Sequence, residues 1–378
     1  MISLPDTARQ IEEAKIFADR ELRPCAGTFD ATGILPRRLI QALAQRGYLA
    51  ATFPVAYGGL GMDPITYGHF SEVIGKACCA TRTLLTVHTS LVGESIVRWG
   101  NAAQKDKWLP QMASGEKIAA FALTEPDTGS DATSIQCTYK TCDNGYLLNG
   151  RKKWISFGDI ADLFLVFAVE GDKKSAFVVE RATPGVTTTP ITGLLAGRAT
   201  HIAEIDFLNV SVPAENILGK EGSGFPYIAY GALDHGRYSI AWAGVAIAQE
   251  ALEAMVSYAR KRVQFGKKIA EFQLIQGIIA DATTQVRAAR ALCLSAGLKR
   301  QEKTQDAEIE TNIAKYFSSK VAMKVATDAV QVFGGNGCCD KYPVERLFRE
   351  AKVMEIIEGT SQIQQGLISE YALREYFK

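Results

Sequence analysis

A carboxylate near the C-terminal end of the sequence has neighbours that suit a catalytic base. Glu358 precedes Gly359 within residues 354–364, between two apolar helical stretches. Apolar surroundings disfavour the charged form of a carboxylate, which raises its pKa and makes it a stronger base. The ordinary alternative is a solvated and inert Glu at a turn, with Thr360 acting only as the N-cap of the last helix.

Four other segments gather residue types that could hold a cofactor. Residues 121–131 offer hydroxyls, backbone N–H groups and a glycine, and residues 150–156 place a tryptophan after a basic run. Residues 260–269 carry four or five positive charges around an aromatic side chain and a glycine, and residues 331–337 are rich in glycine. The ordinary alternatives are a polar turn, a buried tryptophan, a solvated helix end and a helix C-cap. Taken singly, each segment favours its ordinary alternative.

The elements that must position these residues fall into three regions. Residues 1–116 show helical spacing of apolar side chains, and residues 117–222 hold short runs of β-forming residues between turn residues. Residues 223–378 return to long helical stretches joined by short turns, which predicts an antiparallel bundle. The middle region predicts a small β-barrel or β-sandwich. Long helices are expected over residues 240–260, 273–301, 307–333 and 360–375.

Composition argues against several classes of protein. The net charge is +1, from 42 basic and 41 acidic side chains, so neither nucleic acid nor an anionic membrane is an expected partner. No apolar run approaches the ~20 residues that span a bilayer, and no signal-peptide pattern is present, so we expect a cytoplasmic protein. The eight cysteines form no C-x-x-C pair and the four histidines no ligand spacing, so no metal is expected.

Together, in this order and spacing, the five segments resemble the acyl-CoA dehydrogenase family over nearly the whole chain. The resemblance implies an N-terminal all-α domain, a middle β-domain and a C-terminal four-helix bundle, with FAD between the last two. It implies a homodimer or homotetramer in which the adenine end of FAD reaches a neighbouring subunit. The implied substrate is an acyl-CoA or acyl-carrier-protein thioester, and the implied electron acceptor is electron-transfer flavoprotein.

The resemblance also assigns roles to single residues. Glu358 would remove the α-proton of the thioester, with its own backbone N–H stabilising the enolate oxygen, while the β-hydrogen leaves as hydride to flavin N5. The thioester would lie near Ser130, Arg237 and Gly359. FAD would be bound by Phe121, Leu123, Thr124, Gly129, Ser130, Trp154, Ser156, Thr360 and Gln362 and, from the neighbouring subunit, by Arg262, Gln264, Phe265, Gln273, Gln331, Gly334 and Gly335.

Two positions depart from the family's common pattern. Gln264 stands where Thr is frequent, and Ile357 stands where Tyr is frequent, before the catalytic Glu358. Neither change removes a reactive group. The second makes the surroundings of the base more apolar, so burial among Ile356, Ile357 and the flavin is expected to raise the pKa of Glu358.

The choice of acyl group rests on a narrower resemblance. Residues 84–90, 236–242 and 351–359 are similar to dehydrogenases of carrier-protein-bound acyl groups that make hydroxymalonyl or methoxymalonyl extender units for polyketides. Bulky Tyr238 and Trp242 would fit a short substrate, although both would also fit a protein core. The alternatives are a catabolic short-chain acyl-CoA dehydrogenase, a flavin-dependent acyl-CoA oxidase and a non-enzymatic helical protein. Glu358 argues against reduced-flavin monooxygenases of the same fold.

Overall fold

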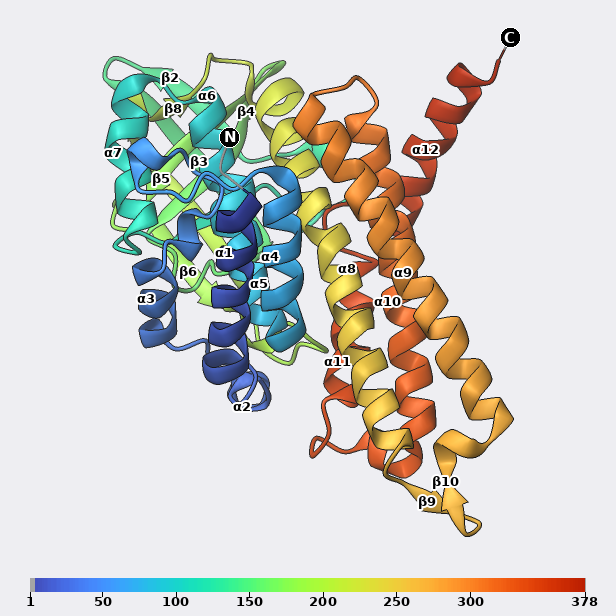
Figure 1. Ribbon diagram of the computed structural model, residues 1–378. Helices are drawn as coiled ribbons and strands as arrows, with labels where there is room; N and C mark the ends of the chain where they lie inside the picture. Colours follow the sequence, from blue (N-terminus) through green and yellow to red (C-terminus); the bar gives the residue numbers. More distant parts are fainter. Residues whose placement is uncertain (1–3, 378) are drawn as a thin grey trace.

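Helices, strands and helices follow one another along the chain, as the sequence predicts (Figure 1). The computed structural model describes residues 4–377. The N-terminal part combines α-helices with π-helical stretches, of which η4 is buried along its whole length. These elements are α1 (Leu4–Phe17), η1 (Ala18–Leu22), α2 (Ala26–Thr32), α3 (Arg37–Gln45), α4 (Pro64–Ala77), α5 (Cys79–Leu85), η4 (Thr86–Gly93), α6 (Glu94–Trp99) and α7 (Ala102–Ala113).

Local capping signals fix the starts of two of these helices. The Asp63 side chain accepts the backbone N–H of Thr66 at 2.9 Å, just before α4. Asn101 and Gln104 form a reciprocal capping box at α7, with hydrogen bonds of 2.9 and 3.0 Å. Both arrangements satisfy N–H groups that the first helical turn leaves without partners.

The middle part is one mixed sheet in the order β6-β7-β3-β2-β4-β5-β8, with β1 parallel to β4. Strand β4 is fully buried over residues 163–168, which matches its continuous apolar run. Strand β1 pairs with this central strand, so residues 121–131, which include and follow the carboxyl end of β1, lie at the edge of the core. The strands are β1 (Ala119–Ala122), β2 (Thr138–Cys142), β3 (Gly145–Ile155), β4 (Leu163–Glu170), β5 (Lys173–Glu180), β6 (Val186–Pro190), β7 (Ala203–Pro213) and β8 (Ile217–Leu218).

A buried ion pair ties the segment after β1 to strand β3. Lys152 is fully buried, and its Nζ lies 2.7 Å from Oε1 of Glu125 and donates to the carbonyl of Leu123 at 3.0 Å. Glu125 also accepts the backbone N–H groups of Gln136 and Cys137, at 2.6 and 2.9 Å. A buried pair this fully hydrogen-bonded fixes geometry more than it adds stability.

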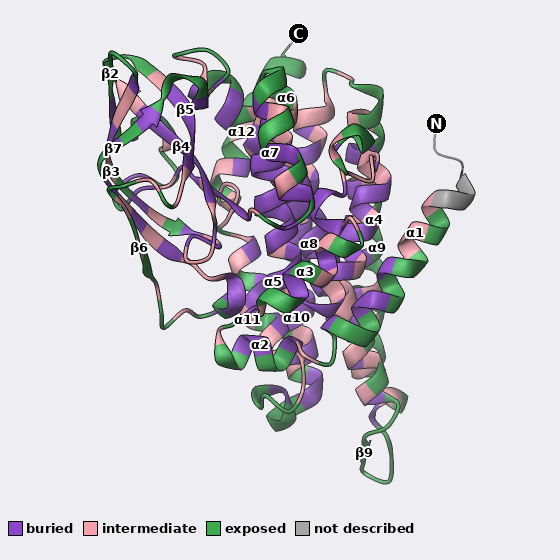
Figure 2. Cartoon of the chain, turned by 90° about the vertical axis from the view of Figure 1, so that its left-hand side faces the viewer, coloured by how far each residue is buried: buried purple, intermediate pink, exposed green. Residues whose placement is uncertain are grey.

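Long helices form the C-terminal part, and α8 is the most deeply placed of them (Figure 2). It packs against α10 in the bundle and against α4 of the N-terminal part. Glycine permits the close approach, because a Cβ at Gly244 would lie 2.7 Å from the backbone oxygen of Ser318. The elements are α8 (Tyr230–Ala259), β9 (Val263–Gln264), β10 (Lys267–Lys268), α9 (Gln273–Glu302), α10 (Ala307–Phe333), α11 (Val344–Met354) and α12 (Ser361–Glu375).

The observed helices agree with the predicted ranges over most of the bundle. Helices α9 and α10 match residues 273–301 and 307–333 to within one residue, whereas α8 begins ten residues before the predicted 240. Across residues 4–377, no helix is both long and apolar enough to span a membrane.

Candidate active site

Glu358 lies on a tight turn between α11 and α12. Its φ is +53° and that of Gly359 is +88°, so two consecutive residues adopt left-handed backbone conformations. A non-glycine residue in this region is strained, and such strain persists only where the surroundings impose it. Lys315 Nζ donates to the Gly359 carbonyl at 2.6 Å, and Gln364 Nε2 donates to the Glu358 carbonyl at 3.2 Å. Thr360 caps α12 by accepting the N–H of residue 363 at 3.2 Å.

The turn directs the Glu358 carboxylate inward, although the residue as a whole is only partly buried. Its Oε2 is buried and, among the described residues, has no hydrogen-bond partner. Helix α8 makes room for it with Gly236, because a Cβ there would lie 2.4 Å from that oxygen and 2.7 Å from Cδ2 of Leu91. The carboxylate therefore lies where α8 meets η4.

Burial is the largest influence on the acidity of this group. It raises the pKa of Glu358 to about 7, and the positive charges of Arg237, Lys315 and Arg82 act in the opposite direction. Burial also lowers the pKa of Lys315, to about 8. A carboxylate whose pKa lies close to neutral can accept a proton efficiently at physiological pH.

One expectation about the origin of this shift is wrong. Ile356 is 53% exposed, so it does not cover the carboxylate as the apolar neighbourhood in sequence predicts. Ile357 does pack against the core. The cover of the Glu358 carboxylate comes instead from α8 and η4.

Arg237 is buried within the second turn of α8. It is 5% exposed, and its NH1 donates to Oδ1 of Asn312 at 3.3 Å, while Nε is buried with no partner in residues 4–377. Arg237 is therefore not a solvated charge at a helix start. Its guanidinium adds positive charge beside Glu358.

The two aromatic residues expected at a short acyl pocket are core side chains between α8 and α4. Trp242 is fully buried, and its ring lies 2.3 Å from the position that a Cβ on Gly68 would take. Tyr238 donates its hydroxyl to the carbonyl of Pro64 at 2.8 Å. Of the two alternatives, an acyl pocket or the protein core, the core is where both side chains pack.

The structure brings together the predicted cofactor residues of the sheet. Phe121 ends β1 against Phe167, with ring centroids 5.1 Å apart, and the carbonyl of Thr124 accepts the N–H of Lys153 at 2.9 Å. The register between β3 and β7 shifts between residues 152 and 155, and Trp154 at this bulge has a φ of +61°. The bulge turns the Trp154 ring outward, leaving it 51% exposed. Leu123 is buried and Ser156 is partly buried.

The loop that follows Thr124 has open backbone. Gly129 and Ser130 are exposed, and a Cβ at Gly129 would meet no atom of the described residues within 4 Å. The hydroxyl of Thr128 is buried without a partner among the described residues. An exposed aromatic ring, open glycine backbone and an unpaired hydroxyl on one edge of the sheet are what a planar polar cofactor requires.

A second predicted set lies apart from this edge. Arg262, Gln264 and Phe265 belong to the β9–β10 hairpin, which protrudes from one end of the bundle (Figure 1), and Phe265 is 94% exposed. Gln273 starts α9 just after it. Gln331 lies in the last turn of α10, and Gly334 and Gly335 directly follow that helix. Within residues 4–377, a Cβ added at either glycine would have no neighbouring atom within 4 Å. Within one chain these residues do not join the Glu358 site.

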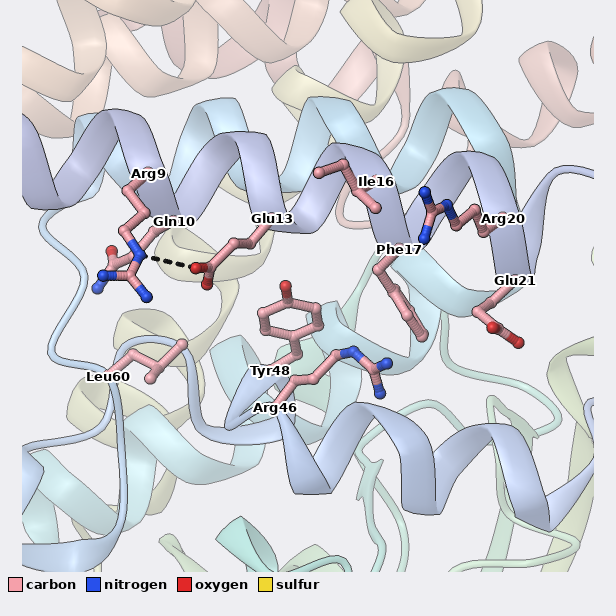
Figure 3. A pocket seen from close by; sticks show the side chains of 10 residues that line it. All are labelled: Arg9, Gln10, Glu13, Ile16, Phe17, Arg20, Glu21, Arg46, Tyr48 and Leu60. Carbon is pink, nitrogen blue, oxygen red and sulfur yellow. Dashed lines mark hydrogen bonds and ion pairs between the residues drawn. The ribbon is translucent and has the colours of Figure 1, made fainter.

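A surface hollow between α1 and the residues after α3 is separate from this chemistry (Figure 3). The Arg9–Glu13 ion pair, 2.8 Å long, runs along α1 at one end of it. The residues that line this hollow include none that was predicted to bind cofactor or substrate. They are Arg9, Gln10, Glu13, Ile16, Phe17, Arg20, Glu21, Arg46, Tyr48 and Leu60.

Three family descriptions match consecutive parts of the chain. "Acyl-CoA dehydrogenase, N-terminal domain" matches residues 5–116. "Acyl-CoA dehydrogenase, middle domain" matches residues 120–210, and "Acyl-CoA dehydrogenase, C-terminal domain" matches residues 222–373.

Known proteins match over nearly the full length. An acyl-CoA dehydrogenase of Bacillus subtilis is 41% identical over 362 residues, 94% of this chain and 95% of the relative. Butyryl-CoA dehydrogenase from Megasphaera elsdenii has a TM-score of 0.94 at 37% identity, covering 97% of this chain and 98% of that one. FkbI, described as serving biosynthesis of the methoxymalonyl extender unit of the polyketide Fk520, has a TM-score of 0.89 at 30% identity, covering 97% and 99%.

Two helical parts around a sheet, with a buried carboxylate at their junction and an open cofactor edge, define a flavin-dependent dehydrogenase. The chain belongs to the acyl-CoA dehydrogenase family. Its members are FAD-dependent oxidoreductases that act on the CH–CH group of acyl-CoA, and the open edge around Trp154 and Gly129 fits that cofactor.

Several residues around Glu358 were not predicted from the sequence. Lys315 and Gln364, which hold the turn, and Gly236, which makes room for the carboxylate, come from three different helices. A lysine and a glutamine at fully buried helix positions are signals of such a role, because a buried polar group is costly unless it is hydrogen-bonded. The glycine inside α8 is a further such signal, because glycine in a helix interior is unfavourable.

Proposed function

We propose that Glu358 is the base that removes the α-proton of a short acyl thioester. One observation carries this assignment. The Glu358 carboxylate is buried with an unpaired oxygen, and this burial raises its pKa to about 7. A thioester α-proton is a weak acid, so the base must be placed close to it and the developing enolate must be stabilised.

The backbone of the same turn supplies an oxyanion donor. No group in the described part of the chain accepts the N–H of Glu358. The Lys315 and Gln364 hydrogen bonds hold the two carbonyls that follow this N–H in the turn. The base and a donor for the enolate oxygen then come from one residue. FAD, when bound, accepts the β-hydrogen as hydride.

The cofactor assignments extend this proposal. Phe121, Leu123, Thr124, Trp154 and Ser156 would hold the flavin ring, with Thr360 and Gln362 at the start of α12 on the other side. Gly129 and Ser130 would lie next to the thioester. The exposed hairpin and the end of α10 would serve the FAD of a neighbouring subunit in a dimer or tetramer, and electron-transfer flavoprotein would accept the electrons.

Two substrate carriers are supported by different relatives. Similarity to butyryl-CoA dehydrogenase favours a short acyl-CoA. The somewhat lower similarity to FkbI favours the second candidate, an acyl group on a carrier protein for polyketide extender units. We take the CoA thioester as the first candidate because the more similar relative supports it.

Anaerobic titration separates these candidates. The FAD-loaded protein is mixed with CoA and carrier-protein thioesters of short acyl groups, and the flavin absorbance is followed. We expect bleaching by short acyl-CoA. Bleaching only by carrier-protein thioesters would favour the second candidate, and no bleaching by any thioester would refute the proposed function.

The pH dependence offers an independent check through Lys315. Proton abstraction needs the Glu358 carboxylate, so kcat/KM should rise with pH through a midpoint near the pKa of about 7. The Lys315 charge lowers that pKa, so Lys315→Met should move the midpoint to higher pH. At pH 6 the variant should lose roughly ten-fold in kcat/KM, and the loss should shrink at higher pH. A uniform loss at all pH values would mean that Lys315 acts only through the shape of the turn.

A further inference from the structure

A single buried carboxylate closes the loop that follows β1. Glu125 is 5% exposed, and it accepts the backbone N–H groups of Gln136 and Cys137, at 2.6 and 2.9 Å. Its Oε1 also lies 2.7 Å from Nζ of Lys152, which is fully buried and donates to the carbonyl of Leu123 at 3.0 Å. The start and the end of this loop are therefore held by one ion pair.

The loop itself, residues 126–135, lies mostly on the surface. Most of its side chains are exposed, and a Cβ at Gly129 would meet no atom of the described residues within 4 Å. The hydrogen bonds of the Asp131 carboxylate, to hydroxyls two and three residues further on, stay within the loop. The hydrogen bonds of the Glu125–Lys152 pair hold both of its ends against β3.

The same pair reaches the other side of the open cofactor edge. Lys152 lies in β3, and the register of this strand shifts between residues 152 and 155, at the bulge that turns Trp154 outward. The backbone N–H of Lys153 donates to the carbonyl of Thr124 at 2.9 Å. The ion pair and this hydrogen bond therefore join the loop that carries Gly129 to the strand that carries Trp154. A cofactor that contacts both must find them at a fixed separation.

Stability alone is a poor reason for such a pair. Moving two charges out of water costs free energy that their attraction often does not offset, and apolar side chains of similar volume can pack in the same space. Apolar side chains could not, however, hold three backbone groups, which here are two N–H groups and one carbonyl. The pair therefore has a geometric role, next to the edge that fits the cofactor.

We propose that Glu125 and Lys152 are positioning residues of the FAD site. They hold the loop of residues 126–135 at the distance from Trp154 that the cofactor requires, so that the site exists before FAD binds. Both side chains are enclosed, so they act through the backbone that they hold. The inference rests on the proposed flavin residues, Trp154 and Ser156 among them, because these place the cofactor at this edge.

A paired substitution tests the proposal. Glu125→Leu combined with Lys152→Met removes both charges and keeps similar volumes, so the thermal midpoint measured without FAD should stay within a few degrees of the wild type. The FAD-loaded protein is then diluted stepwise, and the released flavin is measured by its fluorescence. The Kd for FAD should rise by about 10- to 100-fold, the range found for residues that support metal ligands from behind. A purely structural role would lower the thermal midpoint and leave this Kd unchanged.

Two further variants separate a held backbone from simple packing. Glu125→Gln combined with Lys152→Met supplies one acceptor oxygen without charge, so it should recover part of the affinity for FAD. Arg151→Met is the matched control, because Arg151 lies one residue earlier on β3 and forms an exposed ion pair with Asp206. Its Kd for FAD should equal that of the wild type.

Amide hydrogen exchange on the wild-type protein serves even if the paired variants fail to fold. The N–H groups of Gln136 and Cys137 should exchange slowly after FAD is removed as well as before, because Glu125 already accepts them. Fast exchange of these two amides without FAD, slowed only when FAD is bound, would mean that the pair forms around the cofactor. That result would overturn the proposal.

The outcomes separate this inference from the proposed function. Trp154→Ala should weaken FAD binding if the flavin edge is assigned correctly. Weakened binding in Trp154→Ala with wild-type affinity in the Glu125→Leu, Lys152→Met variant would overturn the role of the pair alone. Wild-type affinity in Trp154→Ala would refute the flavin edge itself, and this inference with it. Neither result depends on Glu358, whose role is tested by thioester bleaching.

Discussion

Replacement of Glu358 with glutamine should slow flavin reduction by an acyl thioester by about 10²- to 10⁴-fold, the usual contribution of a positioned general base. Glutamine has nearly the shape of glutamate and leaves the backbone N–H in place, but its amide cannot take up the proton. Stopped-flow bleaching of the flavin measures the loss. The variant should still bind FAD, because no predicted cofactor contact involves this carboxylate.

The same substitution should make the cofactor-free protein more stable at neutral and higher pH. The pKa of Glu358 is raised to about 7 in the folded state from a usual value of 4.5, so folding disfavours the charged form. That cost is absent below pH 4.5, grows between pH 4.5 and 7, and stays constant above pH 7. At pH 8 the variant should gain up to about 3 kcal/mol in free energy of unfolding.

A matched carboxylate provides the control. Glu355 lies three residues earlier and pairs with Lys352 at 2.8 Å, outside the predicted site. Glu355→Gln should change neither flavin reduction nor the pH dependence of stability in this way. Flavin reduction at the wild-type rate in Glu358→Gln would show that another group takes the proton.

Much of this fold follows from patterns that are local in sequence. The three- and four-residue spacing of apolar side chains in residues 273–301 and 307–333 predicts α9 and α10 to within one residue, because no proline interrupts either stretch. The early start of α8 was missed because residues 230–239 mix polar and apolar side chains on a helix that is buried on several sides. The apolar periodicity of residues 230–239 is therefore a weaker indication of a helix.

The site was predictable in its parts but not in its geometry. The order of five weak segments predicted Glu358 as the base and the segment around Trp154 as part of the cofactor site. The positive φ of Glu358 and the outward direction of Ile356 were not predictable, because distant helices impose the conformation of that turn. The burial of Arg82 was equally hidden, since a single arginine in a helical stretch normally faces solvent.

Substitution of Gly236 with alanine should lower the rate of flavin reduction by about 100-fold without unfolding the protein. The new Cβ would lie 2.4 Å from Oε2 of Glu358 and 2.7 Å from Cδ2 of Leu91, closer than atoms can approach. The ends of both side chains can move, whereas the backbone of α8 is held on several sides, so the carboxylate is what shifts. A displacement on the order of 1 Å at a reacting group costs about 10² in rate.

Gly236→Ala should change the free energy of unfolding only slightly, or increase it. Alanine is better than glycine in a helix interior by about 0.5–1 kcal/mol, which offsets part of the local crowding. Gly231→Ala is the matched control, because a Cβ there meets atoms only at 3.6 and 3.8 Å on the same helix. It should leave the rate unchanged, as measured by the same flavin bleaching.

The pH profile distinguishes displacement of the base from its loss. Gly236→Ala keeps an ionisable carboxylate beside α8, so kcat should still rise with pH through an acid limb, at a lower plateau. Glu358→Gln removes the titrating group, so its residual rate should lose that limb. A wild-type rate in Gly236→Ala would mean that the carboxylate does not occupy this place during catalysis, and that α8 does not position the base.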